Sequence, residues 1–196
     1  SVLFHPLLFA TYMVAIIGFY FPVMLEISPR NFNLILGFVF CFTFILPVVN
    51  IIMFRYFGTI SSYSLRERNE RLVPFVAIAI IYLVMIFLFY NKLPLSENFN
   101  RLMAIVTALV VVSTLITFFY KISIHSVAAS GLIGIMLPLN KAIENNVLLW
   151  PTAIVLVIAG LVMSARLYLN AHTFNEVLTG ALTGFSIGFA GMLILF

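Results

Sequence analysis

The sequence predicts an all-α, polytopic integral membrane protein, a bundle of about six or seven transmembrane helices. Of its 196 residues 64% are hydrophobic and only 8% are charged, against roughly 25% charged in soluble domains. Its mean hydropathy is +1.21, and its apolar stretches approach the length of about 20 residues that a bilayer-spanning helix needs. This composition leaves no room for a sizeable soluble domain, so we expect a single membrane-embedded domain over residues 1–196.

Seven apolar stretches are candidate spans. They cover approximately residues 7–25, 32–54, 73–90, 102–120, 125–140, 147–165 and 177–196. Aromatic residues stand beside bases at several of their ends, as in Arg55-Tyr56 and Tyr120-Lys121, which is typical of a membrane interface. The stretch 125–140 is the weakest of the seven because it is short and polar near its start.

Two local patterns refine the expected bundle. Pro29 follows Ser28, and a proline in the first helical position favours a helix start there. Gly180 and Gly184 are four residues apart, so on a helix they form a face of small residues suited to close packing in lipid.

Charge and cysteine content exclude several classes of function. The net charge is +4, but the bases are scattered singly or lie beside glutamates, so we expect no nucleic-acid partner. The chain has no Asp, and its six Glu and three His are spread along it, so we expect no metal and no other cofactor. Cys41 can form no intrachain disulfide. Residues 1–6 lack the charged start and cleavage site of a signal peptide, so we expect the chain to begin just before its first span.

Three polar segments interrupt the apolar pattern, at residues 61–74, around His125 and at residues 164–176. Each is separated from the next by two predicted spans. Two spans return a chain to the same side of the membrane, so all three segments are expected at one face. This parity favours one composite site built from distant parts of the chain.

The segment 164–176 carries the most informative spacing. His172 and Glu176 are four residues apart and share a face if helical, so the carboxylate can fix the imidazole tautomer. Arg166 lies six residues before His172, where its guanidinium can hold a phosphate while the imidazole attacks phosphorus. Glu176 also completes a capping box with Thr173. Both roles stay open, and we favour the histidine-orienting one.

The other two segments are ambiguous when taken alone. Arg66, Arg68 and Arg71 fit a solvated loop that meets anionic headgroups. His125 follows Lys121 and Ser123, and a lone histidine in an apolar run is more often structural than catalytic, although an ionisable group in a span is a functional hypothesis by default.

His5 stands apart from the three segments. It is flanked by Phe4 and Pro6 near the start of the chain, and we expect it at the membrane interface.

Taken together, these segments resemble the three motifs of the type 2 phosphatidic acid phosphatase superfamily, the lipid phosphate phosphatases and their vanadium haloperoxidase relatives. The third family motif reads Ser-Arg, five residues, His, three residues, Asp. This chain keeps Arg166 and His172 at that spacing, with Ala165 in place of the Ser and Glu176 in place of the Asp.

The first two motifs match more loosely. The second reads Pro-Ser-Gly-His and is kept in Ser123 and His125 only. The first reads Lys, six residues, Arg-Pro; Arg71 stands for its Arg, the Pro is displaced to Pro74, and Arg66 or Arg68 stands for its Lys. The resemblance covers about residues 65–184.

The resemblance implies a metal-independent phosphatase acting on a lipid phosphate or diphosphate. It implies that His172 attacks phosphorus to form a phosphohistidine, that Glu176 orients it, and that His125 protonates the leaving oxygen and then activates water. The implied phosphate ligands are Arg166, Arg71, Arg68, Arg66, Lys121 and Ser123. Membrane lipids and a lipid phosphate substrate are then the expected partners, and the sequence does not predict an oligomeric state.

Two alternatives remain open at this stage. A phosphotransferase of the same family would use the same covalent step and pass the phosphate to another lipid. A non-catalytic transporter or lipid-binding membrane protein would use the buried His and Arg to line a pathway.

Basic residues also bear on the orientation in the membrane. The bases expected at the site face are Arg55, Arg66, Arg68, Arg71, Lys121 and Arg166, and those expected at the other face are Arg30, Lys92, Arg101 and Lys141. When all of these bases are counted, the site face has more of them, which places the site on the cytoplasmic side of the membrane. Setting aside the five of these bases that are candidate phosphate ligands leaves one base at the site face against four at the other, which reverses the assignment. With the analogy to bacterial family members, we expect an inner-membrane protein with an extracytoplasmic site.

Overall fold

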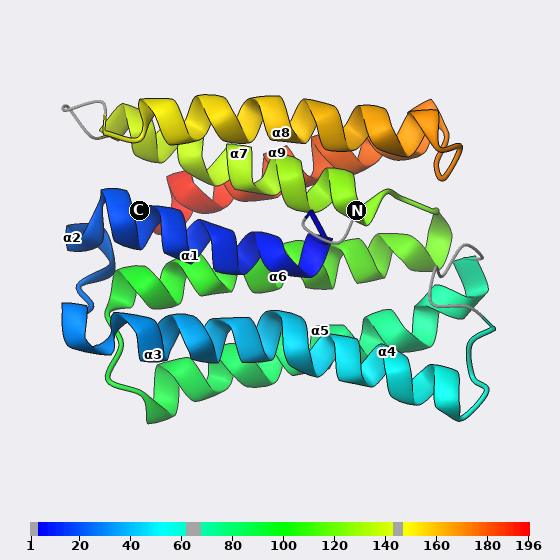
Figure 1. Cartoon of the computed structure of the whole chain (residues 1–196), viewed down its shortest axis with the longest axis horizontal. Coiled ribbons are helices and arrows are strands. Elements are labelled where there is room, and N and C mark those ends of the chain that lie inside the picture. The colour runs from blue at the N-terminus through cyan, green and yellow to red at the C-terminus, as the bar shows by residue number, and fades with distance from the viewer. Residues whose placement is uncertain (1–3, 62–67, 143–146) are drawn as a thin grey trace.

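The chain forms a bundle of helices that run along a common axis, with their connections at the two ends (Figure 1). The computed structural model describes residues 4–61, 68–142 and 147–196, and every regular element in these ranges is a helix. In chain order the elements are η1 (Pro6–Leu8), α1 (Phe9–Tyr20), α2 (Pro22–Leu25), α3 (Pro29–Phe40), η2 (Cys41–Ile45), α4 (Leu46–Tyr56), α5 (Arg68–Lys92), α6 (Glu97–Phe119), α7 (Ile124–Ala142), α8 (Leu149–Tyr168) and α9 (Phe174–Leu195).

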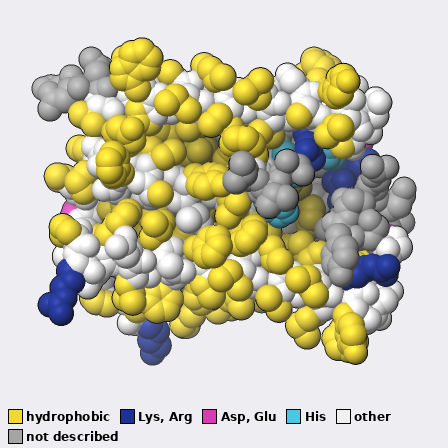
Figure 2. Space-filling model, in the orientation of Figure 1, with side chains coloured by type: hydrophobic (Ala, Val, Ile, Leu, Met, Phe, Trp, Pro, Cys, Tyr) yellow, Lys and Arg dark blue, Asp and Glu magenta, His cyan; other side chains and the backbone are white. Residues whose placement is uncertain are grey.

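The polytopic helical bundle predicted from the sequence is confirmed. Among the described residues, the helices long and apolar enough to span a membrane are Pro29–Tyr56, Glu70–Lys92, Glu97–Phe119, Leu149–Tyr168 and Phe174–Leu195, and a shorter apolar helix covers Pro6–Tyr20. Hydrophobic side chains cover much of the face seen in Figure 2, while Lys and Arg side chains gather towards the ends of the bundle. Such an outer surface suits hydrocarbon, in which apolar side chains need no cover.

Two of the seven predicted spans differ from the expectation. The stretch predicted at 7–25 is not one continuous helix. Helix α1 ends at Tyr20, Phe21 is not helical, and the short helix α2 that follows is capped by Glu26, whose φ is 51°. The weak stretch 125–140 forms α7, a helix of 19 residues that is mostly buried from Ser126 to Met136. Its neighbours are α1, α6, α8 and α9. A helix enclosed by other helices does not need the continuous apolar surface of a lipid-facing span.

Helices α7 and α9 make the most extensive contact in the bundle, and glycines on both helices permit it. A Cβ added to Gly180 would stand 2.7 Å from the carbonyl oxygen of Ser123, and one added to Gly184 would collide with the carbonyl oxygen of Val127. The backbones of the two helices therefore touch directly. The stripe predicted from Gly180 and Gly184 does pack closely, and it sets the spacing of α7 and α9 at the end where both helices start.

A π-helical turn interrupts the long helix Pro29–Tyr56. Pro47 lacks an N–H, so it cannot satisfy the carbonyl of Thr43 four residues earlier. The hydroxyl of Tyr82 on α5 donates to that carbonyl at 3.2 Å, and Tyr82 is only 2% exposed. The sequence thus replaces a helical hydrogen bond with one between helices, which fixes η2 against α5.

Because Gly184 lies against backbone, we expect Gly184→Ala to force α7 and α9 apart and to lower the free energy of unfolding by about 1–3 kcal/mol. The matched control is Gly160→Ala on α8, where an added Cβ meets nothing within 4 Å and the better helix propensity of Ala is worth up to about 1 kcal/mol. Thermal unfolding in detergent measures both. Equal midpoints for the two variants would show that the close contact does not govern stability.

Candidate active site

A cavity of about 610 Å³ opens within the bundle, lined by parts of η1, α1, η2, α4, α5, α6 and α7, by the end of α8 and by the turn between α8 and α9. Its polar end holds the side chains of His5, Arg71, His125, Arg166 and His172. Figure 2 shows His side chains beside Lys or Arg in a hollow of this face. The structure therefore brings together residues from all three polar segments of the sequence, as their parity predicts.

The turn between α8 and α9 explains how Arg166 and His172 reach the same cavity. The N–H of Ala171 donates to the carbonyl of Arg166 at 3.1 Å, and the N–H of Asn170 donates to that of Leu167 at 3.0 Å. Asn170 has a φ of 49°. This is a Schellman motif, in which a left-handed residue closes a helix by turning the chain back over its last turn. His172 is thereby returned to the side of Arg166.

At the start of α9, one carboxylate performs both roles that the sequence left open for it. The Nδ1–H of His172 donates to Oε2 of Glu176 at 2.7 Å, and the N–H of Thr173 donates to the same oxygen at 3.2 Å. The N–H of Glu176 donates back to the Thr173 hydroxyl at 3.3 Å, which completes the capping box. The helix cap therefore immobilises the carboxylate that holds the imidazole. With Nδ1 engaged, Nε2 is the nitrogen of His172 that remains for the cavity.

The other oxygen of the same carboxylate faces a base. Lys121 Nζ lies 4.0 Å from Oε1 of Glu176, and the N–H of Ser123 donates to the main-chain carbonyl of Glu176 at 3.1 Å. These two contacts join the start of α7 to the first turn of α9. The His125 and His172 side chains are therefore held on two helix ends that are bonded to each other.

The two arginines are buried at the polar end of the cavity in different ways. Arg71 is 6% exposed, and its guanidinium donates to the carbonyl of Ile122 at 3.3 Å. Within the described part of the chain, the buried Nε of Arg166 has no hydrogen-bond partner. A buried donor without a partner is costly, and an anion at this end of the cavity would satisfy it.

The remaining predicted phosphate ligands are placed less directly. Ser123 is fully buried, and its Oγ accepts hydrogen bonds from the hydroxyl of Ser126 at 2.9 Å and from its N–H at 3.4 Å. Neither Ser123 nor Lys121 is among the residues that line the cavity. Arg66 lies outside the described residues, and for Arg68 the structure describes the backbone, where α5 begins.

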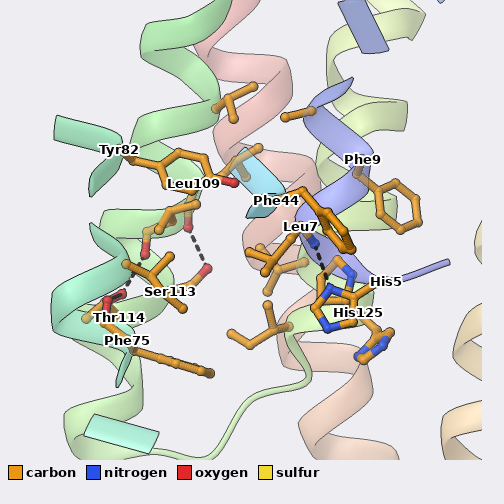
Figure 3. Close-up of a pocket in the computed structure, with 18 of the residues that line it drawn as sticks. His5, Leu7, Phe9, Phe44, Phe75, Tyr82, Leu109, Ser113, Thr114 and His125 are labelled. Carbon is orange, nitrogen blue, oxygen red and sulfur yellow. Dashed lines mark hydrogen bonds between the residues drawn. The ribbon is translucent and has the colours of Figure 1, made fainter. Parts of the chain in front are cut away.

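His5 is the cavity residue that sequence reasoning missed. Sequence reasoning assigned His5 an interfacial position and no part in the site, whereas in the structure it lines the cavity and its ring centroid lies 6.2 Å from that of His125. Figure 3 shows the two labelled rings side by side. No motif surrounds His5 in the sequence. The sequence hint for a role of His5 was that the chain, which is 64% hydrophobic, has only three histidines.

Away from its polar end the cavity is apolar. Leu7, Phe9, Phe44 and Phe75 project along its walls (Figure 3). The hydroxyls in this part already donate to carbonyls, as Ser113 does to Leu109 at 2.5 Å and Thr114 to Val110 at 2.8 Å. Because these donors are satisfied within their own helix, they present little polarity to a ligand. The cavity is amphipathic, cationic at one end and apolar along the rest.

The electrostatics of His172 follow from its surroundings. Its side chain is 7% exposed, and burial is the main cause that lowers its pKa, while the hydrogen bond to Glu176 acts to raise it. The net direction is downward, so the imidazole is neutral at neutral pH. A neutral imidazole with a proton on Nδ1 has a lone pair on Nε2, which is the form that a nucleophile needs.

Metal binding was expected to be absent on sequence grounds. Over the three described ranges, no group of three His, Cys, Asp or Glu side chains is placed to hold a metal ion. The metal-free character of the site stays a prediction, to be tested with a chelator.

The comparison with protein families matches residues 103–196 to the PAP2 superfamily. The match confirms the family resemblance noted in the sequence. It covers His125, Arg166, His172 and Glu176, and it leaves out the part of the chain that contributes Arg71 and His5. No curated protein and no solved structure shows significant similarity to the chain.

We expect Glu176→Gln to lower the rate of phosphate release by up to about 10⁴-fold, because the imidazole loses the carboxylate that fixes its tautomer. The matched control is Thr173→Ala, which removes the hydroxyl of the capping box but leaves the contact with His172. That control should cost about 1 kcal/mol of stability and retain most activity. Turnover and thermal unfolding are measured on the same preparations. A Glu176→Gln variant that is destabilised but fully active would reduce Glu176 to a cap.

The lowered pKa of His172 predicts the pH at which the rate falls on the acid side of the pH profile. Attack requires the neutral imidazole, so the rate of covalent intermediate formation should fall as the pH drops through the pKa of His172, with a midpoint below the ordinary value of about 6.5. Glu176 raises that pKa, so Glu176→Gln should move the midpoint to still lower pH. A pre-steady-state pH profile of both proteins measures this, and a midpoint that rises in the variant would contradict the assignment.

Proposed function

From the match of residues 103–196 to the PAP2 superfamily, which indicates lipid phosphate phosphatase activity in general terms, we propose a specific reaction. The chain removes phosphate from a membrane lipid phosphate or diphosphate, without a metal ion, through a phosphohistidine at His172. The observation that carries this proposal is the hydrogen bond of 2.7 Å between His172 and Glu176, in a cavity shared with His125, Arg71 and Arg166.

In the first step, Nε2 of His172 forms a bond to phosphorus as the bond from phosphorus to the lipid oxygen breaks. Glu176 stabilises the charge that develops on the imidazole. His125 gives its proton to the departing lipid oxygen. The protonated form of His125 is stabilised by a doubly negative phosphate nearby, because opposite charges attract at short range.

In the second step, water attacks the phosphohistidine. The neutral His125 left by the first step takes a proton from that water as the new bond to phosphorus forms and the bond from phosphorus to His172 breaks. Inorganic phosphate leaves, and both histidines return to their starting forms. Arg71 and Arg166 hold the phosphoryl oxygens in both steps, which supplies the positive charge that a metal ion supplies in other phosphoryl-transfer sites.

The apolar part of the cavity supports a lipid as the substrate. A soluble phosphate ester would leave side chains such as Leu7, Phe44 and Phe75 in contact with water, whereas an apolar chain covers them. The hydrophobic effect contributes about 25 cal/mol for each square ångström of apolar surface so covered. The cationic end then meets the phosphate while the tail occupies the interior of the bundle.

Two competing functions make different predictions for the same site. A phosphotransferase would form the same phosphohistidine and pass the phosphate to a lipid hydroxyl in place of water. A transporter or lipid-binding protein would form no covalent intermediate. The hydrogen bond between His172 and Glu176 favours the enzymes, because a binding site does not require a fixed imidazole tautomer.

The proposed orientation places the site at the extracytoplasmic face of a bacterial inner membrane. The charge count supports it once the candidate phosphate ligands are set aside. Among the remaining bases, Arg55 is near the end of α4 at the site end of the bundle, and the bases near helix ends at the opposite end are Arg30, Lys92, Arg101 and Lys141 (Figure 1). Bases retained for chemistry carry no information on topology, whereas those without a chemical role follow the positive-inside rule.

We expect purified protein to release phosphate from at least one of a panel of lipid phosphates and diphosphates in excess chelator, and orthovanadate to inhibit it. His172→Ala should abolish both turnover and covalent labelling, because it removes the imidazole that Glu176 holds in the form able to attack phosphorus. His172→Ala with wild-type activity would end the enzyme hypothesis. Activity that is lost in chelator and restored by magnesium would contradict the metal-free mechanism.

A second variant in the same experiment separates the two histidines. His125→Ala should slow both steps, and a substrate with a good leaving group should restore only the first. The variant should then accumulate an acid-labile phosphohistidine. A labelled intermediate in which the phosphate is not bound to a histidine would show that another residue is the nucleophile.

A further inference from the structure

His5 occupies the boundary between the cationic and the apolar parts of the cavity. On one side its ring centroid lies 6.2 Å from that of His125, and on the other it lies 6.0 Å from that of Phe44, with the rings nearly perpendicular. The labelled side chains in Figure 3 show this succession, with His125 next to His5 and Phe44 above. His5 therefore stands where the phosphate of a lipid substrate would join its tail.

One ring nitrogen of His5 already has a structural partner. Its Nδ1 accepts a hydrogen bond from the N–H of Leu7 at 3.4 Å, which caps η1. Accepting at Nδ1 requires that the proton of a neutral imidazole sit on Nε2. Burial lowers the pKa of His5, so the neutral form is the one present at neutral pH. The cap therefore prepares Nε2–H as a neutral donor at the cavity wall.

The wall that holds His5 is built by the irregular turn η2. Phe44 belongs to this π-helical turn, and it stacks on Phe40 with centroids 5.2 Å apart and an interplanar angle of 21°. A π-turn rotates the side chains that follow it relative to a regular α-helix, and such turns often lie at functional sites. Here the turn directs Phe44 against the ring of His5, which restricts the rotation of that imidazole.

We propose that His5 is a substrate-contacting residue of this site, whose Nε2–H donates a hydrogen bond to a phosphate oxygen of the bound lipid on the side of its tail. The inference rests on the proposed function and extends the site beyond residues 103–196. The N-terminal segment then contributes a ligand as well as a wall. A neutral donor at this point binds the substrate without adding positive charge beside His125, which must exchange a proton in each cycle.

Two substitutions separate this role from simple capping. The side-chain amide of Asn lies near the position of Nδ1 and can still accept from Leu7, but it does not reach the position of Nε2. The amide of Gln reaches the position of Nε2 and can donate there, but it does not serve the cap. Substrate contact therefore predicts that His5→Gln retains binding and His5→Asn loses it. If His5 only caps η1, His5→Asn should retain the thermal stability of the protein and His5→Gln should lower it, with no difference between them in binding.

The experiment measures binding of dodecyl phosphate by calorimetry in detergent, in a His172→Ala background that prevents turnover. We expect His5→Asn to weaken binding about tenfold, the value of one hydrogen bond to a charged group, and His5→Gln to weaken it less than threefold. Thermal unfolding of each protein verifies folding. A folded His5→Asn protein with unchanged affinity overturns the proposal, and so does equal loss in both variants.

The same substitutions in the otherwise wild-type chain give the kinetic readout. His5→Asn should raise the KM for the best lipid phosphate of the panel by about the same factor and should leave kcat within about threefold. If wild-type protein hydrolyses no lipid phosphate, the proposed function fails. The order of the dodecyl phosphate affinities still decides whether His5 contacts a lipid phosphate, so the two failures are distinguishable.

Discussion

The direct backbone contact between α7 and α9 is the constraint on which the site depends. His125 is the second residue of α7, and His172 lies just before α9 begins. Their separation is set by how closely the two helix starts can approach. Gly180 and Gly184 remove the side chains that would keep the backbones apart, and the hydrogen bond from the Ser123 N–H to the Glu176 carbonyl joins the two ends. Packing in lipid relies on such close fit, because apolar burial gives no net drive between helices there.

Ordinary helix-end chemistry then positions the reactive groups. The Schellman motif at the end of α8 and the capping box at the start of α9 are common solutions for unsatisfied backbone groups. Between them they fold the six residues from Arg166 to His172 into a turn that aims both side chains at one cavity. The five residues between Arg and His in the family motif are thus enough for a Schellman motif and the turn that leads to the next helix. Replacing the family's Asp by Glu176 retains the cap as well, since the longer side chain reaches back to the N–H of Thr173.

Sequence reasoning succeeded where a pattern is local or follows from counting spans. Hydropathy predicted the helical bundle and every region that became a long helix, and parity predicted that Arg71, His125 and His172 would meet. It could not predict the break after Tyr20, because an apolar run continues through it. It also missed His5 at the cavity, since that placement depends on η2, whose π-turn arises from Pro47 and the distant hydroxyl of Tyr82. Sequence reasoning also did not predict that Ser123 would be buried against Gly180, because a contact between two distant helix ends leaves no local pattern in the sequence.

The balance of charge at the polar end limits what the cavity can bind. Arg71 and Arg166 bring two permanent positive charges into a site surrounded by apolar helices, and the carboxylate of Glu176 is shared between His172, Thr173 and Lys121. Buried charges are costly unless other groups compensate them. A phosphate group carries more negative charge and more oxygens than a carboxylate, so it can engage two guanidinium groups at once. In the transition state of phosphoryl transfer the charge is spread over the three equatorial oxygens of the transferred group. Two guanidinium groups at one end of the cavity can hold these oxygens while phosphorus lies between its two partners, which is the point at which fixed positive charge contributes to the rate.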